Sequence, residues 1–134
     1  MKRILVILLA TALNGCALYD AYTMTGYDAN EYKLITEIRV DAIVYKAQCA
    51  NPILAQANAV AITYKTLLFE KYSEQVPGND NIIRASKSLN EIAQGLADRY
   101  SSKDPVSTVF CKLKYGGIEN SAMVLQHVVA GRPR

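Results

Sequence analysis

The stretch that decides the fold is "DANEYKLITEIRVDAIVYKAQCANPILAQANAV", Asp28 to Val60. It begins with Asp28 and has Glu31 three residues later, a variant of the capping box that starts a helix. Apolar residues then recur at alternating spacings of three and four, which predicts the buried face of an α-helix. That face consists of Ile35, Ile38, Ala42, Tyr45 and Cys49. Asn51-Pro52 supplies a cap and a first-turn proline for a second helix, so the two helices are expected to form a hairpin.

The second helix is predicted from Pro52 to about Ser73. Residues at the same helical spacings predict its core face, and three further apolar residues widen that face. The face consists of Ile53, Ala57, Val60, Tyr64, Leu67 and Lys71, widened by Leu54, Ala61 and Leu68. Because nearly every residue from Ile53 to Ala61 is small or apolar, we expect this helix to be the most enclosed element of the domain.

A third helix is predicted from about Asn81 to Tyr100, after "EQVPGNDN" (residues 74–81), in which Pro77-Gly78 breaks the chain. Its apolar residues share one face and its charged residues the opposite face, as expected for a helix on the surface of a bundle. The inner face consists of Ile82, Ala85, Leu89, Ile92, Leu96 and Tyr100. The outer face carries Arg84, Lys87, Glu91, Asp98 and Arg99.

The segment "VSTVFCKLKY", residues 106–115, alternates like a strand but follows Asp104-Pro105, which resembles the start of a helix. We predict a helix from Pro105 to Tyr115, because no other segment has the period of a strand that could pair with it. Gly116-Gly117 is expected to end that helix. A last helix, Ile118 to Ala130, would bury Ile118, Ala122, Leu125 and Val129.

These patterns together predict an all-α fold, a small bundle of four or five helices with short connections. The helical domain is expected to span residues 28–131, with residues 132–134 as a tail. About 100 residues suffice for one domain with a core of its own.

The N-terminus has the features of an export signal. Met1-Lys2-Arg3 is positively charged, and the apolar run Ile4 to Leu13 follows it. Ten residues make about 15 Å of helix, half of the ~30 Å hydrocarbon core, so this run is too short for a permanent membrane span. Residues 1–15 are therefore expected to be a signal peptide.

The end of the signal, Leu13-Asn14-Gly15-Cys16, resembles the lipobox of bacterial lipoproteins. The resemblance implies cleavage before Cys16, a diacylglycerol on its thiol and a fatty acid such as palmitate on its amino group. Asn14 departs from the small or β-branched residue usual at that position. The alternative is ordinary cleavage, after Ala12 or Ala17, which would give a soluble periplasmic or secreted protein.

By the same resemblance, Ala17 in place of an aspartate after the cysteine favours the outer membrane, on its periplasmic side. Two or three acyl chains hold a protein on a bilayer firmly, whereas one chain does so marginally. Residues 16–27 then comprise the lipidated cysteine and a tether. The expected partners are the lipid bilayer, through the anchor, and an envelope protein.

Charge and cysteine content fit an exported binding protein. Without Lys2 and Arg3, the 15 basic residues become 13 against 12 acidic ones, so nucleic acid is not an expected partner. With Cys16 lipidated, Cys49 and Cys111 remain as a pair, and such a pair is commonly bridged in an oxidising compartment. A disulfide Cys49–Cys111 is therefore predicted; two buried free thiols are the alternative.

Residues that could perform chemistry are sparse. His127 is the only histidine, and no nucleophile or acid stands near it at motif spacing. Met123 and His127 lie on the same face of one helix and cannot hold haem iron from opposite sides. No zinc or calcium motif is present. We therefore expect no catalytic residue, no metal and no cofactor apart from the lipid on Cys16.

The expected function is a non-enzymatic binding or structural role, in which the anchored domain docks onto another envelope protein as an assembly, exclusion or inhibitor factor. Tyr32, Tyr72 and Tyr115, near helix ends, are candidate partner contacts, because tyrosine offers contact area at little entropic cost. One alternative is an envelope enzyme or cell-wall factor that uses His127. Another is a small-ligand carrier, with its cavity among Ile53, Val60 and Leu89.

Overall fold

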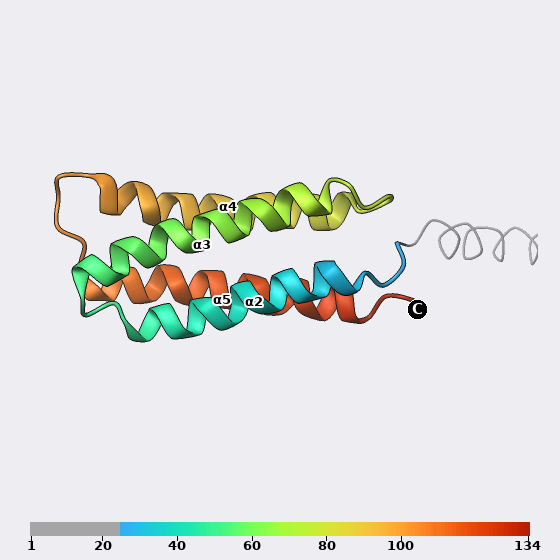
Figure 1. Ribbon diagram of the computed structural model, residues 1–134, viewed down its shortest axis with the longest axis horizontal. Helices are drawn as coiled ribbons and strands as arrows, with labels where there is room; N and C mark the ends of the chain where they lie inside the picture. The colour runs from blue at the N-terminus through green and yellow to red at the C-terminus, as the bar shows by residue number, and fades with distance from the viewer. Residues whose placement is uncertain (1–24) are drawn as a thin grey trace, which may run out of the picture.

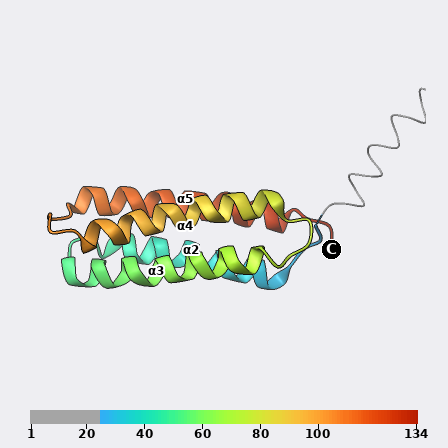
Figure 2. The same ribbon diagram turned by 90° about the horizontal axis from the view of Figure 1, so that it is seen from above.

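The computed structural model describes residues 25–134; the predicted signal peptide, Cys16 and the predicted tether before Thr25 lie outside the described residues. Within this part the chain forms an antiparallel bundle whose four helices are α2 (Ala29–Ala47), α3 (Pro52–Ser73), α4 (Asp80–Ser101) and α5 (Thr108–Ala130). The helices form two layers, because α2 packs mainly on α5 and α3 mainly on α4 (Figures 1 and 2). The predicted all-α bundle is confirmed.

Side-chain caps begin three of the helices. Asp28 Oδ1 accepts a hydrogen bond from the Glu31 backbone N–H at 2.8 Å, and Asn51 Oδ1 accepts one from Leu54 N at 3.1 Å, as the sequence predicted. The start of α5 differs from the prediction. Ser107 caps it, its Oγ accepting from Phe110 N at 3.1 Å. Pro105 therefore lies before the helix and not in its first turn.

The C-terminal third of the chain is one helix, not two. Residues 108–115 are helical, as predicted, but Gly116 and Gly117 do not end the helix, because α5 continues through them to Ala130. Glycine is only about 1 kcal/mol less favourable than alanine in a helix interior, and buried residues on both sides outweigh that cost. The buried residues of α5 are Cys111, Tyr115, Ile118, Ala122, Leu125 and Val129.

The core lies between the two layers and contains most of the predicted inward positions of α2, α4 and α5. Ile35, Leu89, Leu96 and Ile118 are fully buried. Burial of such side chains stabilises the fold by roughly 1.5–3 kcal/mol each, before the conformational entropy of the chain is counted.

The predicted core face of α3 is wrong. Ile53, Val60 and Tyr64 are 83%, 61% and 67% exposed, so the stripe assigned to the core points outward. The opposite side of α3 is buried instead, and it consists of Ala55, Asn58, Ala59, Ile62, Thr66, Phe69, Glu70 and Ser73. Its small residues allow close helix approach, and its polar residues find partners on neighbouring helices.

Cross-helix hydrogen bonds explain how those polar residues are accommodated. Asn58 Nδ2 donates to Gln48 Oε1 at 2.6 Å, towards α2. Thr66 Oγ1 donates to Asn90 Oδ1 at 3.0 Å, and Asn90 Nδ2 donates to Glu70 Oε2 at 3.1 Å, both between α3 and α4. Each buried polar side chain of α3 therefore has a hydrogen-bond partner within the protein in place of water.

The disulfide Cys49–Cys111 is present, as predicted, with the two Cα atoms 5.8 Å apart. Cys49 lies just after α2, and Cys111 in the first turn of α5. The bridge therefore joins the two helices of one layer at the end of the bundle that carries the α2–α3 and α4–α5 connections (Figure 1).

A buried polar cluster closes the opposite end. The Glu31 carboxylate accepts hydrogen bonds from Ser73 Oγ at 2.9 Å, Asn79 Nδ2 at 2.6 Å and Arg132 Nη1 at 2.6 Å. The Glu31 side chain therefore binds residues of the buried cluster and does not turn back to the Asp28 backbone as in a capping box. The predicted tail 132–134 is part of the packed structure, because Arg132 enters this cluster and the Pro133 carbonyl accepts from Tyr27 N at 2.8 Å.

Candidate functional site

An apolar groove lies between α4 and α5 and has a volume of about 510 Å³. We call it the α4–α5 groove; it is lined by Asn81, Ile82, Ala85, Ser88, Leu89, Asn120, Ser121, Val124, Leu125 and Val128. Leu89, Ile82 and Leu125 form its buried floor. Val124 and Val128 are 60% and 48% exposed and form its apolar wall.

The lining of the α4–α5 groove contains only uncharged residues. Its polar members are two asparagines and two serines, which offer short-range hydrogen bonds and no net charge. The groove residues of α4 follow the start of that helix at Asp80, and those of α5 precede its end at Ala130. The groove therefore lies in the half of the bundle that holds both ends of the described chain. This arrangement can desolvate an apolar segment and hold its edges by hydrogen bonds.

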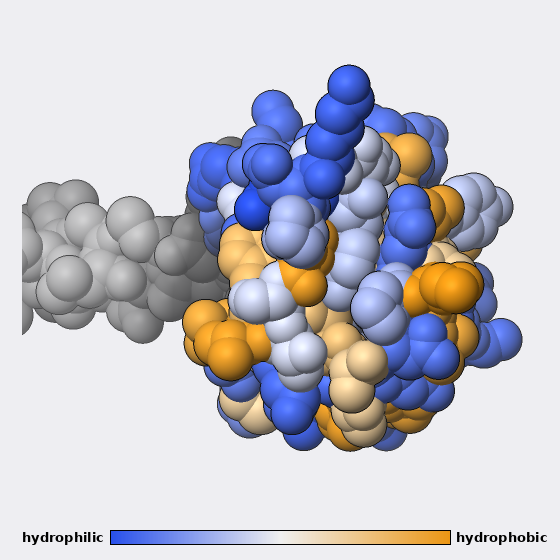
Figure 3. Space-filling model, turned by 90° about the vertical axis from the view of Figure 1, so that its left-hand side faces the viewer, coloured by the Kyte–Doolittle hydropathy of each residue, from blue (hydrophilic) through white to orange (hydrophobic). Residues whose placement is uncertain are grey.

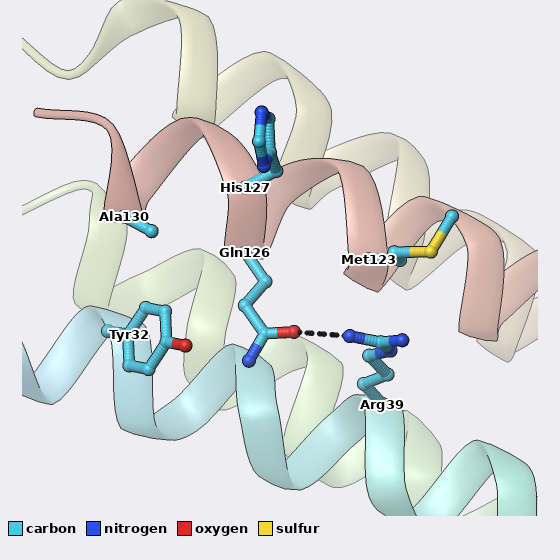
Figure 4. A pocket seen from close by; sticks show the side chains of 6 residues that line it. All are labelled: Tyr32, Arg39, Met123, Gln126, His127 and Ala130. Carbon is cyan, nitrogen blue, oxygen red and sulfur yellow. Dashed lines mark hydrogen bonds between the residues drawn. The ribbon is translucent and has the colours of Figure 1, made fainter.

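His127 lines a different and smaller pocket, of about 230 Å³, between α2 and α5 (Figure 4). The other lining residues are Tyr32, Arg39, Met123, Gln126 and Ala130. Gln126 points to α2, where its Oε1 accepts from Arg39 Nη1 at 2.8 Å and its Nε2 donates to Thr36 Oγ1 at 2.7 Å.

Beside His127, this pocket is lined by the guanidinium of Arg39 and the thioether of Met123. An acid or nucleophile would be needed beside the imidazole for proton transfer or covalent catalysis, and none is among these lining residues. In Figure 4 the ring projects from α5 in a different direction from Gln126. Cys111 is held in the disulfide, 16 residues or about 24 Å of helix away.

The three candidate contact tyrosines differ in their exposure. Tyr32 and Tyr72 are half-buried near the end that carries Thr25, and Tyr72 Oη donates to the Asp28 carboxylate at 3.0 Å. The expectation that Tyr115 is exposed is wrong, because its side chain is 0% exposed and packs edge-on against Tyr45, with ring centroids 5.9 Å apart. A buried ring cannot contact a partner.

The Tyr115 hydroxyl is a buried polar atom without a hydrogen-bond partner among residues 25–134. Burial is the main cause that raises the pKa of this phenol above its ordinary value of 10, and the phenols of Tyr100 and Tyr45 add to the effect. Tyr115 therefore stays neutral inside the core at physiological pH.

The face of α3 that points away from the core is a second apolar surface, and sequence reasoning missed it. We call it the α3 outer face; it consists of Ile53, Leu54, Ala57, Val60, Ala61, Tyr64, Leu67 and Leu68. Viewed from the end opposite Thr25, the bundle shows hydrophobic patches on several sides between hydrophilic residues (Figure 3). The sequence holds one indication of this face. Small and hydroxyl-bearing residues also recur at helical spacing on the opposite side of α3, and that side is the buried one.

The described residues hold neither a metal-binding cluster nor a helix suited to crossing a membrane. No group of three or more His, Cys, Asp or Glu side chains within residues 25–134 is arranged to hold a metal ion. None of the helices in this part of the chain has the length and hydrophobicity that crossing a membrane requires.

No protein-family model matches the chain, and comparison with curated proteins and with solved structures gives no significant match.

Proposed function

We propose that this chain is an exported lipoprotein that docks onto another envelope protein through the α4–α5 groove. The anchoring part of the proposal rests on Leu13-Asn14-Gly15-Cys16, which resembles a lipobox. Cleavage there would leave nine residues, Cys16 to Met24, before the described chain. At 3.3–3.6 Å per residue they reach about 30 Å at most, so the domain works beside its membrane.

The observation that carries the docking proposal is the uncharged apolar groove in the half of the bundle near Thr25. Its two walls run from Asn81 to Leu89 and from Asn120 to Val128, each about 12 Å or two helical turns long. A groove of this length and chemistry suits the apolar face of an amphipathic helix, anchored by residues at positions i, i+3 or i+4, and i+7. The proposed occupant is such a helix of the partner.

The uncharged lining sets the specificity of the docking. A charged side chain entering the groove would lose its water without gaining an opposite charge, and that loss is costly. The four asparagine and serine side chains can accept or donate hydrogen bonds at the edges of an apolar helix.

The test is photo-crosslinking of the full chain in its own envelope. A benzophenone amino acid at Ser88, in the groove, is expected to give one adduct of defined mass, with the crosslink on an amphipathic helix of the partner. The same amino acid at Glu91, on the outward face of α4, is the matched control and should give no such adduct. Val124→Lys should abolish the Ser88 adduct, whereas Leu113→Lys, at an α5 position that is 70% exposed and outside the groove, should leave it intact.

The anchor is tested separately with Cys16→Ala. This variant should lose incorporated palmitate and be released from membranes by washing. Palmitate on the variant would refute lipidation at Cys16. A Ser88 adduct insensitive to Val124→Lys, or no adduct at all, would refute docking through the groove.

A further inference from the structure

The α3 outer face is an unusually apolar surface for a helix on the outside of a bundle. Ile53, Tyr64 and Val60 are 83%, 67% and 61% exposed, and Leu54, Leu67 and Leu68 are 40–42% exposed. The eight residues of the face are all uncharged, and the one charged residue between Ile53 and Leu68 is Lys65, at the border of the face. The exposed face of α4, by contrast, carries Arg84, Lys87, Glu91 and Asp98, which is the ordinary pattern of a solvated helix.

The size of the α3 outer face matches one side of a stable interface. Its six large side chains expose on the order of 700 Å², close to the ~800 Å² that each partner contributes to a standard interface. Apolar patches above a few hundred Å² on a soluble domain mark places where something else binds.

The order of the residues makes the α3 outer face complementary to itself. The eight positions are symmetric about a point between Val60 and Ala61. In two antiparallel copies of α3 related by a two-fold axis at that point, each apolar residue faces another. The pairs are Ile53 with Leu68, Leu54 with Leu67, Ala57 with Tyr64, and Val60 with Ala61.

The sizes of the paired side chains also match. The large ring of Tyr64 meets the small Ala57 of the second copy on both sides of the axis, and Ala61 at the centre lets the helices approach closely. A parallel pair would place Tyr64 against Tyr64 and leave a gap between the two copies of Ala57. It would also bring Lys71 next to Lys71, whereas the antiparallel pair places Lys71 opposite Ala50.

Charge at the border of the face favours a protein over a bilayer as the occupant. Lys65 Nζ lies 2.5 Å from Asp41 Oδ2 and 3.9 Å from Glu37 Oε2, and Lys71 Nζ lies 2.6 Å from Glu74 Oε1. Helices that lie on membranes usually carry unpaired lysine and arginine for the anionic headgroups, and these two lysines are paired.

We propose that the α3 outer face is the interface of a homodimer in which two copies of α3 pack antiparallel about an axis between Val60 and Ala61. The contact is isologous, since the same patch of each copy meets the other. The α4–α5 groove is formed by two other helices, so a dimer of this kind presents two docking grooves.

The test is cysteine crosslinking of the full chain in membranes, since the disulfide holds both native thiols of the domain. Ala61→Cys, beside the axis, should give a covalent dimer under oxidation. Ile53→Cys alone should not, because its two copies would lie about 22 Å apart along the helices. Ile53→Cys mixed with Leu68→Cys should give a dimer again.

A second measurement uses the mass of the purified chain in detergent solution, by light scattering corrected for the bound detergent. Val60→Lys should lower the dimer fraction about tenfold or more, because an unpaired charge would be buried at the interface. Leu113→Lys, an equally exposed apolar position on α5, should leave the dimer unchanged, with circular dichroism confirming that both variants are folded.

The following outcomes would overturn the proposal. A monomeric wild-type chain, or a dimer that survives Val60→Lys, excludes this face as the interface. Efficient crosslinking of Ile53→Cys to itself excludes the antiparallel arrangement. An Ala61→Cys thiol protected from water-soluble maleimide in a monomeric chain assigns the face to the bilayer or to a different protein.

Discussion

Glu31, in the first turn of α2, and Arg132, two residues past the end of α5, form a buried ion pair with Arg132 Nη1 2.6 Å from Glu31 Oε2. The Glu31 side chain is 0% exposed and that of Arg132 9%. Arg132 also donates to Asn79 Oδ1, so one guanidinium joins α2, the α3–α4 connection and the C-terminus. The last residues of the chain are therefore structural.

Replacement of Arg132 should destabilise the bundle strongly. Arg132→Met leaves the Glu31 carboxylate buried without its cation, which we expect to lower the free energy of unfolding by about 3–5 kcal/mol. Lys46→Met, which breaks the half-exposed pair with Glu119, is the control and should cost about 1 kcal/mol or less. Denaturant unfolding followed by circular dichroism measures both. Equal losses in the two variants would contradict a special role for the buried pair.

Tyr115→Phe should stabilise the protein. The substitution removes a buried hydroxyl that has no partner among the described residues, and we expect a gain of roughly 1 kcal/mol at pH 7. Denaturant unfolding at neutral pH measures the gain. A loss of stability in Tyr115→Phe would contradict the absence of a partner for this hydroxyl.

The same variant tests the pH dependence of stability. The pKa of Tyr115 is raised above 10 in the fold, so its neutral form is common to both states below pH 10. Above pH 10 the unfolded chain loses this proton first, and stability falls as the pH rises. Tyr115→Phe should reduce that fall by about 1 kcal/mol between pH 10 and 11, because the phenol of the unfolded chain is only half ionised at pH 10. Parallel curves for wild type and variant between pH 10 and 11 would show that the phenol is not the cause.

Loss of the disulfide should lower stability without changing the helical content. The bridge spans 62 positions, and the chain-entropy account gives it about 4 kcal/mol, an upper estimate. Cys49→Ala with Cys111→Ala should therefore lower the Tm. Reductant should lower the Tm of wild type and have no effect on the double variant. A reductant effect of the same size in both would point to another cause.

Alanine in place of the two central glycines of α5 should stabilise the helix. A Cβ at position 116 would meet no atom within 4 Å, and one at position 117 only an ordinary contact at 3.9 Å. We expect a gain of about 1 kcal/mol for each substitution. Gly78→Ala is the opposing control, because its φ of 70° suits glycine and the variant should be less stable. Thermal unfolding would detect either sign.

The sequence was sufficient to predict the helices α2, α3 and α4, the Asp28 and Asn51 caps, and the disulfide, because each depends on local chemistry or on simple counting. It was insufficient for α3. Both sides of that helix carry residues at helical spacing, and the large apolar side chains favoured the wrong one. What decides the inner face is the set of partners for Thr66 and Glu70, above all Asn90, and those partners lie on another helix.

The candidate docking surfaces were harder to predict for the same reason. The α4–α5 groove depends on which residues of two helices meet, and Gly116-Gly117 had suggested that α5 was two helices. Tyr115 was assigned to the surface because it preceded those glycines. Once α5 is continuous, Tyr115 falls on the buried face with Cys111 and Ile118, four positions before it and three after it.

The disulfide also determines how the domain would carry a mechanical load. A pull applied at Thr25 against the C-terminal part of α5 would first strain the Tyr27–Pro133 and Glu31–Arg132 contacts, and α2 once they break. At Cys49 the force would cross directly to Cys111 through covalent bonds and would bypass α3 and α4, which lie between the two cysteines. A domain built in this way could lose part of one helix under tension and still keep residues 50–110 out of the load path.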